Sequence, residues 1–237
     1  MDRKILRTDD IGVIQVIGEK TNVLPMWAMN HYITEFCNNY NKIILVQRIC
    51  LLIQSGYNYK QFIVAKRSAE PIPQKSLEDS FNYSEKKFIS LDNHEDNYND
   101  FWHIIFNYVR PVVFVKDSRG SFQPLMDFDD VEAIKIIKMS YNSPPWWDIR
   151  GAINSVLDIA NAKIRKEMEE EKHIAIQIEQ GAKNYESIAR ASQVIDDSST
   201  PNEIKEYAKI GLEELLEKQA ILNNKLGIRV GRIDKKV

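Results

Sequence analysis

The sequence has few cysteines, no long hydrophobic run and no excess of charge of one sign. Cys37 and Cys50 are the two cysteines among 237 residues, which favours buried free thiols and a reducing, cytoplasmic location. No run approaches the roughly 20 apolar residues of a membrane-spanning helix. The N-terminus lacks the apolar core and cleavage site of a secretory signal. We therefore expect no transmembrane segment and no peripheral membrane contact.

The charge balance argues against a dedicated polyanion-binding protein. The net charge is −2 with 28% charged residues, and basic and acidic residues are spread evenly along the chain. Nucleic-acid binding depends mainly on clustered Lys and Arg, so direct contact with nucleic acid is not expected, although a local basic patch can still form on folding. The hydrophobic fraction of 43% is ample for a sizeable core.

Residues 1–145 predict an α+β head domain with a mainly antiparallel sheet and helices. The strands and helices do not alternate regularly, as a doubly wound parallel sheet would require. A helix is expected from Pro25 to the asparagine cluster at 38–41, and another around Phe101–Tyr108 that Pro111 ends. The β-branched and apolar content favours strands at 12–18, 42–53, 62–65, 111–115 and 132–141, with a further strand within 81–91. At 42–53 a short helix is the alternative, because periodicity alone does not separate the two.

Residues 146–237 predict a second module, a long antiparallel helical hairpin of coiled-coil type. Apolar residues recur every three or four positions from Ile153 to Ala189 and again from Ile204 to Leu226. Thr200-Pro201-Asn202-Glu203 has the N-cap, first-turn proline and glutamate of a helix start. Gly227 is a typical helix stop. A narrow stripe of this kind suits packing of one helix on another.

This hairpin and the tryptophan pair before it are the predicted partner-binding surface. Adjacent tryptophans after two prolines can fill a partner's groove, stack on a ligand, or cover the seam between the two modules. The predicted partner-binding residues are Trp146, Trp147, Ile164, Ile178, Leu212, Leu215, Leu222 and Leu226.

The chain shows no catalytic signature. No glycine-rich phosphate loop and no nucleophile elbow is present, and the four histidines lie in unrelated settings. We therefore predict no catalytic residue, no cofactor and no metal. The alternative is a Mg²⁺ site at Asp127, Asp129 and Asp130, because alternating carboxylates suit a hard cation.

One resemblance covers about a third of the chain. The segment Ile134–Pro145, then Asp148-Ile-Arg-Gly151 and a long charged stretch, resembles the C-terminal part of small bacterial proteins of unassigned activity. Some of these proteins belong to conflict or anti-phage gene clusters. The resemblance implies no catalytic residue.

The function that these observations favour is a non-enzymatic interaction or assembly subunit. It would belong to a bacterial multi-protein complex, in anti-phage defence if the resemblance holds, and its hairpin would dock a protein partner or form a homo-oligomer. One alternative is a metal-dependent, nuclease-like effector that uses the Asp127–Asp130 cluster. Another is a sensor whose head binds a ligand and transmits this through the hairpin.

Overall fold

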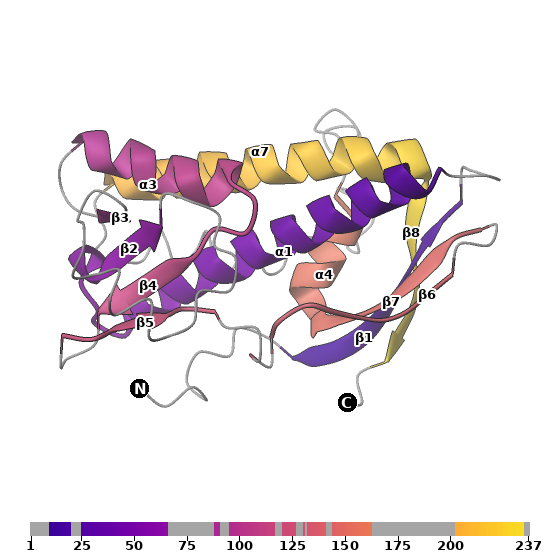
Figure 1. Cartoon of the computed structure of the whole chain (residues 1–237), viewed down its shortest axis with the longest axis horizontal. Helices are drawn as coiled ribbons and strands as arrows, with labels where there is room; N and C mark the ends of the chain where they lie inside the picture. The colour runs from indigo at the N-terminus through magenta and orange to yellow at the C-terminus, as the bar shows by residue number, and fades with distance from the viewer. Residues whose placement is uncertain are drawn as a thin grey trace, which may run out of the picture.

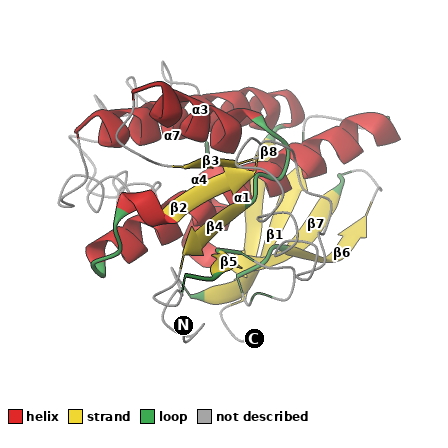
Figure 2. Cartoon of the chain, turned by 60° about the vertical axis from the view of Figure 1, so that its left-hand side comes forward, coloured by secondary structure: helices red, strands yellow, loops and turns green. Residues whose placement is uncertain are grey.

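The computed structural model describes residues 10–19, 25–65, 88–90, 95–116, 120–126, 130, 132–140, 144–162 and 202–234. Two four-stranded antiparallel sheets lie toward opposite ends of a layer of helices, as Figures 1 and 2 show. The longest helix, α1 (Met26–Gln54), runs from one sheet toward the other. All its buried hydrophobic side chains join strand and helix residues in one hydrophobic core.

Sheet A has the strand order β6-β7-β1-β8 and joins segments from both ends of the chain. In β1, which the glycine-bounded β-branched pattern correctly predicts, Ile14 and Val16 are fully buried and alternate with half-buried residues. Its neighbours on either side are β7 and β8. The bounds are β1 (Ile11–Gly18), β6 (Lys135–Ser140), β7 (Trp146–Ala152) and β8 (Ile228–Asp234).

The helices pack on one face of sheet A, here called the inner face. Gly12 and Gly151 are opposite each other in the β1–β7 ladder. A Cβ on Gly12 would lie 2.8 Å from Ile153 of α4 (Ile153–Ala160), and one on Gly151 would lie 3.0 Å from the Tyr40 hydroxyl of α1. The two glycines therefore let α4 and α1 approach the sheet closely.

Sheet B has the order β3-β2-β4-β5 and lies beside the second half of α1. Phe62, Val64, Val113 and Val115 belong to the main core, whereas Ile63, Ala65 and Phe114 form a small second cluster. The bounds are β2 (Phe62–Ala65), β3 (Phe88–Ser90), β4 (Val113–Lys116) and β5 (Phe122–Pro124), with the short helix η2 (Tyr59–Gln61) before β2 and α3 (Glu95–Asn107) between β3 and β4.

The strand predicted at 42–53 is wrong, because α1 continues without a break to Gln54. Ile43, Ile44, Leu45 and Val46 are all at most 2% exposed. A helix that is surrounded by other elements is hydrophobic on all sides, so its sequence loses the amphipathic period and looks like a buried strand.

The predicted C-terminal helical hairpin is also wrong. The helix that begins the predicted hairpin, α4, ends at Ala160. The expected helix start near Pro201 and the stop at Gly227 agree with α7 (Asn202–Leu226) and with the left-handed φ of +60° at Gly227. The chain then returns as β8 and pairs with β1, so α7 is one helix of the α+β fold and not half of a hairpin. Residues 163–201 lie outside the described residues.

The described helices lack the combination of length and hydropathy that crossing a membrane requires.

Candidate functional site

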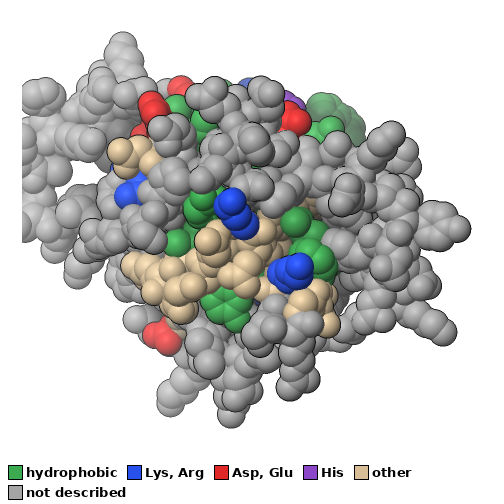
Figure 3. Space-filling model, turned by 90° about the vertical axis from the view of Figure 1, so that its left-hand side faces the viewer, with side chains coloured by type: hydrophobic (Ala, Val, Ile, Leu, Met, Phe, Trp, Pro, Cys, Tyr) green, Lys and Arg blue, Asp and Glu red, His purple; other side chains and the backbone are tan. Residues whose placement is uncertain are grey.

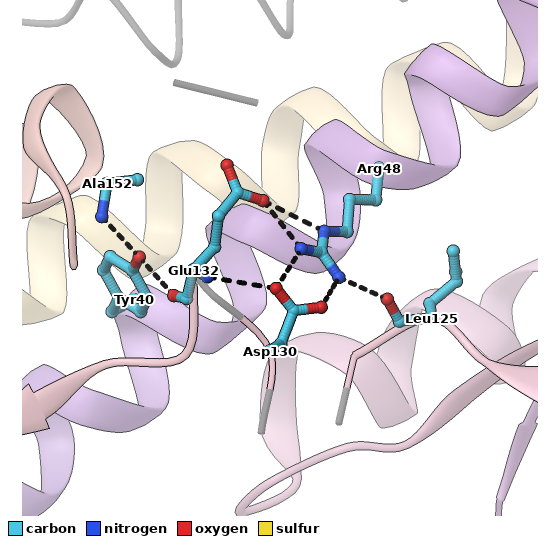
Figure 4. Close-up of polar contacts among 6 residues, drawn as sticks. All are labelled: Tyr40, Arg48, Leu125, Asp130, Glu132 and Ala152. Carbon is cyan, nitrogen blue, oxygen red and sulfur yellow. Dashed lines mark hydrogen bonds and ion pairs between the residues drawn. The ribbon is translucent and has the colours of Figure 1, made fainter. Parts of the chain in front are cut away.

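A buried ion network surrounds Arg48 in the second half of α1 (Figure 4). The guanidinium donates to both carboxylate oxygens of Asp130, at 2.5 and 2.7 Å, and to Oε2 of Glu132 at 2.7 and 3.2 Å. It also donates to the Leu125 carbonyl at 2.5 Å. The Arg48 side chain is 3% exposed and that of Glu132 is fully buried. The network fastens the chain between β5 and β6 to α1.

Tyr40, two helical turns before Arg48, continues the same network. Its hydroxyl donates to the Glu132 carbonyl at 2.6 Å and accepts from the Ala152 amide at 2.7 Å. Burial raises the pKa of Tyr40, so its hydroxyl keeps the proton that it donates. Burial lowers the pKa of Arg48, but the hydrogen bonds and charges of Asp130 and Glu132 outweigh it and the pKa is raised. The arrangement is that of a structural clamp.

The alternative metal site finds no support in this network. Both carboxylate oxygens of Asp130 accept from Arg48, and Oδ1 also accepts from the Glu132 amide. A guanidinium in this position neutralises the carboxylate that a cation would need. Asp127 and Asp129 lie outside the described residues. Within the described residues, no three His, Cys, Asp or Glu side chains converge to hold a metal ion.

The leucines predicted to bind a partner face the interior of this chain. Leu212, Leu215 and Leu226 of α7 are 1%, 3% and 8% exposed within the main core, and the half-buried Leu222 packs against it. Polar side chains set the register of α7 on α1: the Asn39 amide donates to Gln219 at 2.8 Å, and the Tyr32 hydroxyl donates to Asn223 at 3.1 Å. Ile164 and Ile178 lie outside the described residues.

The two adjacent tryptophans point to opposite faces of sheet A. Trp147 is opposite Val16 on the inner face, is 1% exposed, and its ring lies 5.3 Å from that of Tyr32. Trp146 is opposite Ile17 on the other, outer face and is half-buried. Successive strand residues alternate between faces, so Trp147 serves the core and Trp146 lies on the outer face with part of its side chain exposed.

The outer face of sheet A gathers basic side chains from three strands. Residues opposite each other in an antiparallel ladder share a face, and the registers give three rows across the sheet. Arg232 belongs to the middle row because its Nη2 lies 3.7 Å from Asp148. We call this surface the basic face. Its rows are Lys135, Arg150, Val13 and Asp234; then Lys138, Asp148, Gln15 and Arg232; then Ser140, Trp146, Ile17 and Arg229.

The charges of the basic face divide into paired and unpaired groups. At the β8 edge, Arg232 pairs with Asp234 at 2.9 Å and Arg229 pairs with Glu19. At the β6 and β7 side, Lys135, Lys138 and Arg150 form no ion pair with any described residue. Asp148 is 6% exposed and accepts from Gln15 at 3.2 Å. The positive charge available to a partner is therefore concentrated on β6 and β7.

No described element covers the basic face. The helices α1 and α4 lie against the inner face, and Figure 1 shows no described helix on the outer side of sheet A. The end of the molecule that carries sheet B differs, because the basic side chains visible there stand singly among apolar and uncharged groups (Figure 3). The basic face thus combines several cations from neighbouring strands with an aromatic side chain, whereas in sheet B a single exposed lysine, Lys116, lies over the ring of Phe122.

Sequence reasoning missed the basic face because its residues come from three separate segments, 13–17, 135–150 and 229–234. On β7 a trace of the strand period remains, because Trp146, Asp148 and Arg150 are every second residue. On β6 a bulge between Ile136 and Lys138 breaks this period. Comparison of the chain with models of protein families, with curated proteins and with solved structures gives no match. The candidate site therefore rests on geometry and charge.

Proposed function

We propose that this chain is a non-enzymatic binding protein that docks an anionic partner against the basic face. The observation that carries the proposal is the placement of five basic and two acidic residues on one sheet face that no described element covers, three of the basic ones without an ionic partner among the described residues. A surface of this kind attracts a polyanion and accelerates its association. A role in a larger assembly would use this face in place of a helical hairpin.

The non-enzymatic part of the proposal is supported by the chemistry of the buried groups. In the cluster around Arg48, the guanidinium donates its hydrogen bonds to Asp130, Glu132 and the Leu125 carbonyl within the chain. Burial raises the pKa of the Cys37 thiol to about 11 and that of Cys50 to about 12, so neither is an activated nucleophile at neutral pH. The basic face, by contrast, offers charge and an aromatic ring but neither carboxylate–histidine pairs nor a thiol.

Retention on a heparin column tests this proposal. We expect the unmodified protein to be retained at low salt and to elute on a salt gradient, because heparin is a polyanion that reports accessible clustered cations. The double variant Lys135→Glu/Lys138→Glu reverses two exposed charges on β6 and should elute at clearly lower salt.

A matched variant tests whether heparin retention depends on the basic face or only on the net charge of the protein. Lys218→Glu/Lys225→Glu makes the same change in net charge on exposed positions of α7, and it should elute close to the unmodified protein. Equal loss of retention in both variants, or no retention of the unmodified protein, would overturn the proposal.

A further inference from the structure

Trp146 distinguishes the basic face from a simple patch of charge. It lies in the outermost row of the face, between Ser140 on β6 and Ile17 on β1, and no described helix covers it. A partly exposed indole ring on the same sheet face as cations offers a π-face to a flat ligand as well as an apolar area. Phosphate or sulfate groups alone do not need such a ring.

The dimensions of the face fit a short stretch of nucleotides. Four strands at about 4.8 Å spacing give a width of roughly 14 Å, and the five residues from Trp146 to Arg150 span a similar distance along β7. In one RNA-binding module, a four-stranded sheet stacks two or three bases on aromatic side chains of its strands, and basic side chains contact phosphates. Lys138 and Arg150 follow Trp146 along the neighbouring rows and would meet the backbone.

Duplex nucleic acid fits this surface less well. Reading a major groove requires an α-helix or a two-stranded ribbon that projects into it, and no described helix lies on the outer side of sheet A. An acidic protein would satisfy the lysines and arginines but gives no reason for a tryptophan on the same face as these cations. The ring and the charges together favour a nucleic acid that is single-stranded and has unpaired bases.

We infer that the anionic partner is a single-stranded nucleic acid that stacks a base on Trp146 and places its phosphates near Lys135, Lys138 and Arg150. This inference rests on the proposed function, because it names the partner of the same face. Removing a stacking ring costs affinity for a single strand but leaves the charge of the face unchanged.

Fluorescence anisotropy with a labelled 15-nucleotide oligouridine tests the inference, with Trp146→Leu as the main variant. Leucine keeps an apolar side chain in the half-buried position but has no π-face. We expect Trp146→Leu to weaken oligouridine binding about tenfold or more, while its retention on heparin stays that of the unmodified protein. Trp146→Phe should restore most of the affinity, and Trp27→Leu, at a position 74% exposed on α1, should leave it unchanged.

Two further measurements test the same inference: the salt dependence of oligouridine binding and the affinity for a duplex. The slope of log K against log salt should fall by about 1.4 in Lys135→Glu/Lys138→Glu, since each lost phosphate contact on a single strand contributes about 0.7. A 15-base-pair duplex of the same chemistry should bind more weakly than oligouridine.

The outcomes separate the two proposals. Heparin retention that depends on Lys135 and Lys138, combined with oligouridine affinity that does not change in Trp146→Leu, would overturn the nucleic-acid inference and point to an acidic protein. Preference for the duplex over the single strand would overturn it as well. Absence of heparin retention would overturn the proposed function itself, and the inference with it.

Discussion

Arg48 and Arg150 show two different uses of the same side chain. Arg48 lies in the interior, and its guanidinium meets two carboxylates and a backbone carbonyl. Arg150 lies half-buried on the basic face, with its Nε buried, and has no ionic partner among the described residues. A fully buried charge must be paired because its desolvation is expensive, whereas a partly exposed charge keeps contact with water and needs no partner within the chain. The pairing of a cation therefore indicates whether it serves the fold or a partner.

Replacing Arg48 by methionine should have the largest effect on stability. Arg48→Met keeps much of the apolar volume but leaves the fully buried Glu132 without its cation, and we expect a loss of about 3–5 kcal/mol. The free energy of unfolding from urea titration, followed by far-UV circular dichroism, measures it.

The control is the same substitution on the basic face. Arg150→Met should change the free energy of unfolding by less than about 1 kcal/mol. The double variant Arg48→Met/Glu132→Gln should recover part of the loss, because the uncompensated carboxylate is removed. Equal costs at positions 48 and 150 would contradict the distinction between the two arginines.

Trp147 and Trp146 extend the comparison to apolar side chains. Trp147→Leu replaces an indole that is 1% exposed and packs on Tyr32 by a smaller side chain. The cavity that remains should lower the free energy of unfolding by roughly 2–3 kcal/mol. Trp146→Leu acts on the half-buried outer position and should cost less than about 1 kcal/mol. The urea midpoints of the two variants give the difference directly.

An inversion of this order would show that the outer face, and not the inner one, supports the core. In that case the half-buried Trp146 would be a structural residue, and its proposed contact with a base would lose its basis. Both variants carry the same change in composition, so a difference between them reflects position on the sheet.

Local patterns in the sequence predicted the elements whose shape depends on nearby residues. The glycine-bounded, β-branched stretch at 12–18 corresponds to β1, and Gly227 ends α7 with a left-handed φ. A glycine adopts a left-handed φ without strain, and a β-branched stretch suits a half-buried pleated strand whichever segments pair with it. The same holds for the strand at 62–65, which agrees with β2.

Elements that depend on distant partners were not predictable in this way. The segment Ile228–Asp234 is a strand because it pairs with β1, more than 200 residues earlier, and its own side chains are mostly exposed. The second half of α1 lost its amphipathic period because sheet B, α3 and α7 surround it. The basic face likewise required the register between β6, β7, β1 and β8, since an even charge distribution along the chain says nothing about local charge after folding.

The interior thiol of Cys50 gives the smallest predicted effect, and it depends on pH. Burial raises the pKa of Cys50 to about 12, whereas the thiol ionises near pH 8.5 in the unfolded chain. Below pH 8 the thiol is protonated in both states and contributes no pH dependence. As the pH rises toward 12, the thiol loses its proton in the unfolded state, which stabilises that state, but keeps it in the folded state. The free energy of unfolding therefore falls.

Between pH 7 and 9.5 the unmodified protein should therefore lose about 1 kcal/mol more of its free energy of unfolding than Cys50→Ala does. Comparing the two proteins at each pH cancels the pH-dependent contributions of the other interior groups. Cys37, with a raised pKa, lowers stability as the pH rises, whereas Lys42, whose pKa burial lowers, has the opposite effect. Urea titrations at both pH values measure the difference. Equal losses in the two proteins would mean that Cys50 ionises as readily in the folded chain as in water, and that this part of α1 is open to solvent.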